Sequence, residues 1–177
     1  HEYSSSSRLR AVAKSVSTLS EAGLPAAPMR PSMARVSRTA GRKAQTATTF
    51  DFGFALGPRI NAAGRLADMT LGIECLLTDD AARASELAHT LDAINRERRE
   101  IEGGMRDQAM LITESMFVEE DTPPAAISVF DEGFHEGVVG IVASRIKDKL
   151  HRPTFVFAAS KAPGKEAELK GSGRSIP

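Results

Sequence analysis

The stretch AISVFDEGFHEGVVGIVASRIKDKLHRPTFVFA, residues 126–158, decides the fold of the C-terminal part of this chain. Residues 126–130 and 154–158 are short apolar runs typical of buried strands, and residues 137–150 repeat apolar side chains at helical spacing. A strand, a helix and a second strand joined by short connections form a βαβ unit. We therefore predict an α/β fold with two parallel strands, followed by a third strand at residues 169–176.

A long amphipathic helix is predicted at residues 79–117, with Asp79 or Asp80 as its N-cap. Its apolar stripe consists of Ala84, Leu87, Leu91, Ile94, Ile101, Met105 and Ile112. Glycine is a poor helix former, so the glycine pair at residues 103–104 marks a weak point or a close contact. At 1.5 Å per residue the helix would be about 58 Å long, so we expect it to connect two domains.

Before this helix, residues 71–77 predict a short helix entered through Asp68 or Thr70. The pair Gly57-Pro58 predicts a turn. Residues 1–39 are rich in Ser, Ala, Arg and Pro without a sustained period, so we expect disorder or irregular coil. This segment superficially resembles a transit peptide, but we favour an out-of-frame stretch of the gene.

Composition narrows the class of protein. The chain has 177 residues, 41% hydrophobic and 26% charged, which indicates a globular protein. Its single cysteine, Cys75, excludes an internal disulfide and fits a reduced, cytoplasmic setting, and no apolar run is long enough to cross a membrane. Eight Phe, one Tyr and no Trp argue against a single-strand binder built on stacked aromatics. Because the formal net charge is zero, a phosphate site must be local.

The first candidate site is the segment HEGVVG, residues 135–140, between a predicted strand and a predicted helix. Such places bind ligands in α/β sheets, and a helix N-terminus offers N–H groups to a phosphate. Gly137 and Gly140 allow close approach of the backbone. His135 can donate to a phosphate oxygen or position a nucleophilic water. The alternative is a loop histidine that caps the helix beside glycines needed for packing.

The second candidate is GSGRS, residues 171–175. Arg174 can give a bidentate contact to an anion, with Ser172, Ser175 and backbone N–H groups completing the pocket. The alternative is a flexible linker.

The third candidate is residues 57–65, where Arg59, Asn61 and Arg65 can contact a phosphate backbone. The alternative there is that Arg59 or Arg65 pairs with Asp68 or Glu74. No metal-ligand spacing is present among the histidines.

Three segments together resemble the RecJ family of single-stranded-DNA exonucleases, in the DHH phosphoesterase superfamily. They are residues 55–65 (ALGPRINAAGR), 134–145 (FHEGVVGIVASR) and 169–175 (LKGSGRS), in this order around a long charged helix. The resemblance covers residues 40–176 and identifies the chain as an internal fragment.

The family's architecture implies the following division. Residues 1–39 stand apart as the disordered or out-of-frame segment, residues 40–78 end a DHH-type domain, residues 79–122 form the connecting helix, and residues 123–177 form the first half of a DHH-associated α/β domain.

The resemblance implies a parent that cuts single-stranded DNA from its 5′ end by two-metal hydrolysis, with Mn²⁺ or Mg²⁺, in DNA repair and recombination. His135 is the implied catalytic residue. The residues implied to bind DNA or phosphate are Arg59, Asn61, Arg65, Gly137, Ser172, Gly173 and Arg174. The implied partners are a 5′-phosphorylated single strand and a single-strand-binding protein or helicase.

The family's metal ligands, an Asp-rich motif and an Asp-His-His triplet, have no counterpart in this sequence, so we expect no metal ligand and no hydrolysis by this chain alone. Three other functions stay open. They are a DHH-type phosphoesterase acting on short oligonucleotides or cyclic dinucleotides, a non-catalytic nucleic-acid-binding scaffold, and a helical linker that self-associates.

Overall fold

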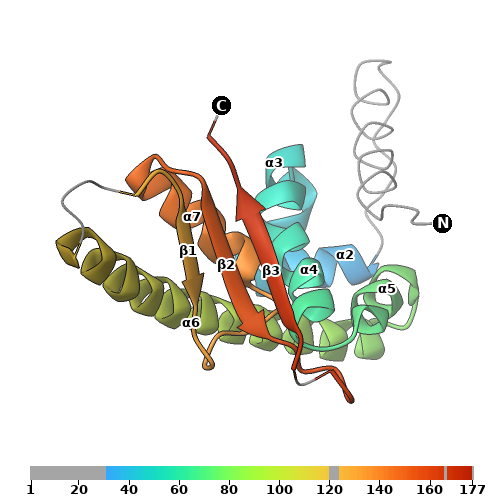
Figure 1. The fold of residues 1–177 in the computed structure, drawn as a ribbon. Helices are drawn as coiled ribbons and strands as arrows, with labels where there is room; N and C mark the ends of the chain where they lie inside the picture. The colour runs from blue at the N-terminus through green and yellow to red at the C-terminus, as the bar shows by residue number, and fades with distance from the viewer. Residues whose placement is uncertain (1–30, 120–123, 166, 177) are drawn as a thin grey trace. The chain divides into compact units, whose positions relative to one another are not determined.

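The computed structural model describes residues 31–119, 124–165 and 167–176 of the chain (Figure 1). The chain divides into two compact units between Ala93 and Ile94. This division falls inside the longest helix, α6 (Ala81–Glu119), so each unit takes part of that helix. Each unit is described by itself below.

The first unit is built from helices. In chain order they are α2 (Pro31–Thr39), η1 (Ala44–Thr46), α3 (Thr49–Asp51), the π-helical turn η2 (Phe52–Leu56), α4 (Gly57–Leu66), α5 (Met69–Leu77) and the first part of α6. The carboxylate of Asp68 accepts a hydrogen bond from the N–H of Thr70 and caps α5. Asp80 likewise accepts from the N–H groups of Ala82 and Arg83 and caps α6. Of the two cap residues predicted for each helix, the structure shows Asp68 for α5 and Asp80 for α6.

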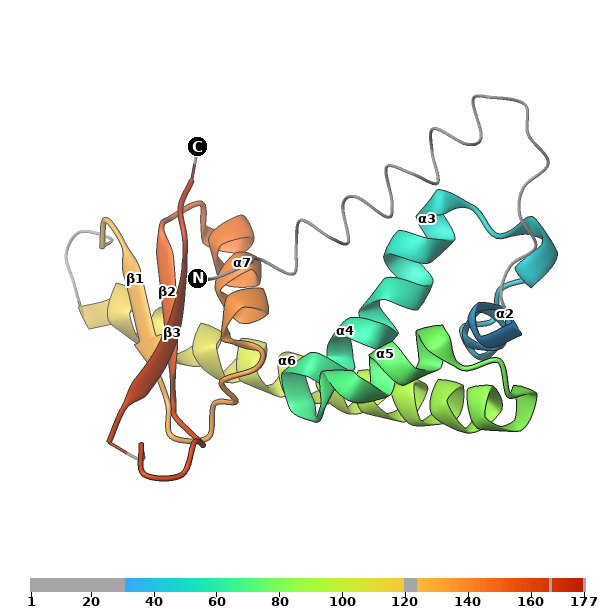
Figure 2. The ribbon, with the colours of Figure 1, turned by 90° about the vertical axis from the view of Figure 1, so that its right-hand side faces the viewer.

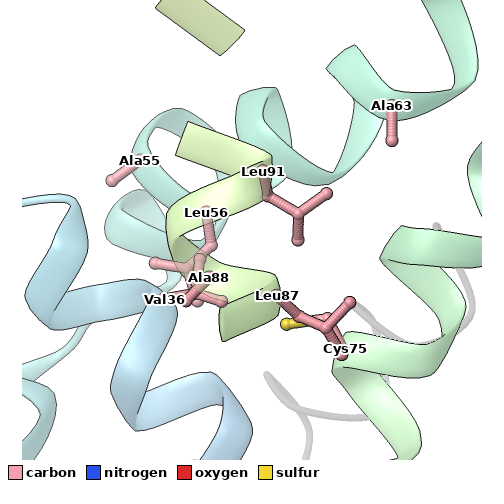
Figure 3. Packing of buried hydrophobic residues seen from close by; sticks show 8 residues of the cluster. All are labelled: Val36, Ala55, Leu56, Ala63, Cys75, Leu87, Ala88 and Leu91. Atoms are coloured by element: carbon pink, nitrogen blue, oxygen red, sulfur yellow. The ribbon is translucent and has the colours of Figure 1, made fainter. Parts of the chain in front are cut away.

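One apolar cluster holds these helices together, as Figure 3 shows. Its buried members are Val36, Ala55, Leu56, Ala63, Cys75, Leu87, Ala88 and Leu91. Leu87 and Leu91 come from the predicted apolar stripe of α6, which places that stripe against the core as expected. Cys75 is fully enclosed, and burial raises the pKa of its thiol. The cysteine is therefore a packing residue rather than a nucleophile.

The prediction of irregular coil is wrong for residues 31–39, which form α2. Val36 of α2 has no exposed surface and belongs to the apolar cluster. Composition alone did not indicate this helix. Packing of its apolar face against the core stabilises it, because most helical stability in proteins comes from such tertiary contacts. The rest of the predicted coil, residues 1–30, lies outside the described residues.

The predicted turn at Gly57-Pro58 is also wrong. These residues begin α4, and Gly57 has helical dihedral angles, with φ −51° and ψ −47°. Proline is tolerated in the first turn of a helix because the N–H that it lacks has no partner there within the helix. The chain therefore continues from η2 into α4 without reversing direction.

The helix α6 runs without a break through Gly103 and Gly104, so the expected weak point does not interrupt it. The side chains of Arg98 and Glu102 form an ion pair along its surface. Within the residues that the structure describes, no helix is both long and apolar enough to cross a membrane.

The second unit contains a three-stranded sheet in the order β1-β2-β3 (Figure 1). Strand β1 (Ile127–Phe130) runs parallel to β2 (Thr154–Ala159), and the helix α7 (Val139–Leu150) connects them. Strand β3 (Leu169–Arg174) pairs antiparallel with β2. The predicted βαβ unit and third strand are therefore confirmed, and the fold is α/β.

The sheet has one covered face. Figure 2 shows α7 lying along this face, where Ile127 and Val129 of β1 and Val156 and Ala158 of β2 are buried. On the opposite face Phe130 and Phe155 are 43% and 44% exposed. The predicted strands are thus buried on one side only within the described residues.

Candidate phosphate-binding site

The first part of the site is the turn that leads from β1 into α7. Phe134 is buried and anchors this turn, and the backbone N–H of His135 points at the sulfur of Met105 on α6 at 3.2 Å. His135 itself is only partly buried. The sequence therefore places an apolar anchor directly before a histidine that keeps contact with solvent.

The imidazole of His135 is held in one tautomer. The backbone N–H of Gly137 donates a hydrogen bond to Nδ1 of His135 at 3.1 Å. Because Nδ1 accepts this bond, the proton of the neutral ring resides on Nε2. His135 can therefore offer an N–H donor at Nε2 to an oxygen of a ligand, and Gly137 serves to orient the ring.

The environment also favours the neutral form of His135. Burial, followed by the charge of Lys161, lowers the pKa of His135, while Glu136 and Glu97 act in the opposite direction. A neutral donor binds an anion without a proton uptake step.

The second part of the site is β3, on which Lys170, Ser172 and Arg174 alternate and so share one face. The guanidinium group of Arg174 donates through Nη1 to Oγ of Ser172 at 2.8 Å and to the carbonyl of Gly173 at 2.7 Å. Gly173 has its own packing role, since a methyl group there would lie 2.7 Å from the ring of Phe155. The arginine is exposed and therefore accessible to a ligand.

The structure brings these two parts together at Gly140 in the first turn of α7. A methyl group on Gly140 would lie 2.9 Å from Nη2 of Arg174 and 3.1 Å from Oγ of Ser172. The glycine thus permits the start of α7 to approach β3 closely. No side chain caps α7, and the first N–H groups of a helix lack partners within it. The result is a site with Arg174, Ser172 and a helix N-terminus side by side, suited to an anion.

The sequence did not predict the ion pair between Lys170 and Glu136 at this site. The ammonium group of Lys170 lies 2.9 Å from Oε2 of Glu136 and forms an ion pair with it. Contact with Lys170 is the main cause that lowers the pKa of Glu136. No local pattern indicates this pair, because β3 and the turn meet only in the folded chain.

The third predicted segment belongs to the first unit, on α4. Arg59 is largely buried, and its side chain donates to Asp92 on α6 at 2.8 Å and to the carbonyl of Ala55 at 2.7 Å. Arg59 does not take Asp68 or Glu74 as its partner, since it pairs with Asp92, and Glu74 pairs with Arg83. Asn61 and Arg65 are exposed on the same helix.

The described residues do not offer a metal site. Among residues 31–119, 124–165 and 167–176, no group of three or more His, Cys, Asp or Glu side chains could hold a metal ion. The described part of the chain therefore does not fit a two-metal centre.

The second unit is an α/β unit in which an arginine-bearing strand lies beside a helix N-terminus, an arrangement whose N–H donors suit an anion. No protein-family profile matches the chain. The single-stranded-DNA-specific exonuclease RecJ of Escherichia coli K12 is 47% identical over 147 residues, which is 83% of this chain and 25% of that protein.

Two solved structures are similar as well. RecJ of Thermus thermophilus in complex with Mg²⁺ superposes with a TM-score of 0.66 at 31% identity, over 83% of this chain and 21% of the other. An exonuclease RecJ bound to manganese gives a TM-score of 0.60 at 29% identity, over 84% of this chain and 42% of the other. The chain is thus similar to RecJ exonucleases over 83% of its own length, and it spans about a quarter of the length of the E. coli relative.

Proposed function

We propose that this chain supplies the 5′-phosphate-binding part of a single-stranded-DNA exonuclease that cuts from the 5′ end. The observation that carries the proposal is the contact of Gly140 with Ser172 and Arg174, which joins the start of α7 to the guanidinium group. A terminal phosphate carries more charge than an internal one and has three free oxygens. A bidentate arginine, a serine hydroxyl and helix N–H groups match that set of acceptors.

In this proposal Nε2 of His135 donates to an oxygen of the terminal or the scissile phosphate. Gly137 holds the ring, and Gly173 gives the backbone of β3 its close packing. Arg59, Asn61 and Arg65 contribute to the path of the DNA backbone from the first unit. For Arg59 this contribution is through the placement of α4, since its guanidinium group already binds Asp92 and Ala55.

The proposal extends to the whole protein. Residues 40–78, 79–122 and 123–177 correspond to the end of a DHH domain, a connecting helix and part of a DHH-associated domain. Divalent metals, when bound elsewhere in such a protein, activate water for hydrolysis, and this chain alone does not hydrolyse DNA. In the same proposal, the whole protein acts in DNA repair and recombination in the cytoplasm, and its partner is a single-strand-binding protein or a helicase.

The experiment compares Arg174→Ala with the unchanged chain in binding to an oligonucleotide that carries either a 5′ phosphate or a 5′ hydroxyl. We expect the unchanged chain to prefer the phosphate, and the variant to lose about tenfold on that strand, which corresponds to about 1.4 kcal/mol for a charge-assisted contact. Lys165→Ala, at an exposed loop position, serves as the control.

If Arg174→Ala weakens binding of both strands equally, Arg174 does not recognise the terminal phosphate and is a general DNA contact instead. Tighter binding of di- and trinucleotides than of long strands would instead favour a phosphoesterase that acts on short oligonucleotides.

A further inference from the structure

The turn that carries His135 is tied to β3 by side chains that the proposed function does not use. Lys170 on β3 contacts Glu136, the residue next to His135, at 2.9 Å. The backbone of Lys161, which follows β2, also helps to lower the pKa of this carboxyl group. The ion pair with Lys170 therefore connects the turn before α7 to β3.

We propose that Glu136 is a positioning residue, which together with Lys170 holds the His135 turn against β3 in the geometry that recognises a terminal phosphate. The inference rests on the proposed function, because the phosphate is the ligand whose recognition it explains. Neither Glu136 nor Lys170 needs to touch the ligand.

The geometry of β3 explains how the pair acts. Lys170, Ser172 and Arg174 emerge on the same face of the strand, and pairing with β2 fixes the register of all three. Residues 131–138 before α7 have no such ladder. An ion pair between Lys170 and the residue after His135 thus sets the distance between the His135 donor and the Ser172–Arg174 pair.

The exposure of Lys170 and Glu136 indicates how much their ion pair contributes to the stability of the fold. The side chain of Lys170 is 50% exposed and that of Glu136 is 22% exposed. Oε2 of Glu136 is itself enclosed, but the lysine that pairs with it is half-exposed, so solvent screens the pair and its net contribution to the free energy of folding is small. We therefore expect its loss to change ligand discrimination while the unfolding temperature stays nearly constant.

A purely electrostatic role for Glu136 predicts a different result. Removing its negative charge makes the surroundings of the phosphate more positive, which strengthens binding of any strand. Discrimination between a 5′ phosphate and a 5′ hydroxyl would then be retained. A positioning role predicts that discrimination falls, whatever happens to the affinity for DNA in general.

The test uses the full chain and four variants. Glu136→Gln and Lys170→Met each break the pair, and Glu136→Lys combined with Lys170→Glu restores it in reverse. Glu168→Gln is the matched control, because it removes the same charge from an exposed ion pair with Lys165 in the loop between β2 and β3. Fluorescence anisotropy with 5′-phosphorylated and 5′-hydroxyl oligothymidylate gives the ratio of the two dissociation constants. Nitrogen NMR of the His135 ring reports the position of the turn without any ligand.

We expect each single variant of the pair to lower the ratio several-fold and to shift the Nδ1 signal of His135. The reversed pair recovers both properties, and Glu168→Gln changes neither. An unchanged ratio with an unchanged ring signal in Glu136→Gln overturns the inference, as does an equal effect of Glu168→Gln.

The proposed function can fail separately. If the unchanged chain shows no preference for the 5′ phosphate, that function is wrong, and the ring signal alone then decides whether Glu136 positions the turn. If the nitrogen signal of the His135 ring shifts in Glu136→Gln but not in Glu168→Gln, Glu136 positions the turn. If the signal does not shift in Glu136→Gln, Glu136 does not position the turn.

Discussion

At the scale of single residues, local sequence was informative where one segment provides both a side chain and the backbone that orients it. His135 and Gly137 are two positions apart, and their hydrogen bond lies within one turn. A histidine before a glycine at the start of a helix already indicated such an arrangement. The tautomer with the proton on Nε2 follows from this bond, and a titration can test it.

We predict that His135 titrates below the ordinary value of 6.5, because burial and the charge of Lys161 disfavour the imidazolium. The folded state then binds a proton less readily than the unfolded state, so this residue lowers stability as the pH falls from above 6.5 toward the depressed pKa of the fold. An NMR titration of the His135 ring checks this, and a midpoint at or above 6.5 would contradict it.

Arg59 shows what local sequence cannot provide. Its partner Asp92 is 33 positions away, on another helix, and only the folded core brings the two together at 2.8 Å. The sequence analysis proposed Arg59 as a DNA contact, with an ion pair to Asp68 or Glu74 as the alternative. It could not distinguish a contact to DNA from an ion pair inside the first unit, because both use the same guanidinium donors.

We predict that Arg59→Ala lowers the free energy of unfolding by about 2 kcal/mol, because it leaves the Asp92 carboxylate without this largely buried charged partner. Urea denaturation followed by circular dichroism measures the change. Arg65→Ala, an exposed position on the same helix, is the control and should change stability by less. Wild-type stability of Arg59→Ala combined with weakened DNA binding would instead identify Arg59 as a direct DNA contact.

At the scale of elements, periodicity predicted the long helix and the βαβ unit, since both patterns are repeated over many residues. The start of α4 was not predictable in the same way. Gly-Pro is compatible with a turn and with a helix N-terminus, and packing of Leu56 into the core decides in favour of the helix. For α2, one buried valine outweighs a composition that resembles coil.

We predict that Gly103→Ala stabilises α6. The site is in the helix interior, and a methyl group there meets no atom within 4 Å. Alanine is favoured over glycine in a helix by about 1 kcal/mol, so the unfolding midpoint should rise in thermal denaturation. Gly140→Ala is the contrasting variant, because its methyl group would press on Arg174 and Ser172. A fall in stability for Gly103→Ala would show that the glycine serves a contact of another kind.

At the scale of the whole molecule, the three motifs separate into two groups. The turn with His135 and the strand with Ser172 and Arg174 meet in the second unit, while Arg59, Asn61 and Arg65 belong to the first. The connecting helix predicted at residues 79–117 already separated the first motif from the other two, but spacing along the chain does not report that the turn and the strand meet. The βαβ topology supplies the reason, since β3 joins the same sheet that α7 covers.

The measurement that tests the central claim most directly is NMR mapping of the full chain with a 5′-phosphorylated dinucleotide, compared with the same dinucleotide bearing a 5′ hydroxyl. The account predicts that the difference between the two maps centres on residues 135–140 and 172–174, with the ring of His135 among the signals that move. Equal shifts with both ligands, or differences centred on the first unit, would contradict a terminal-phosphate site formed by α7 and β3.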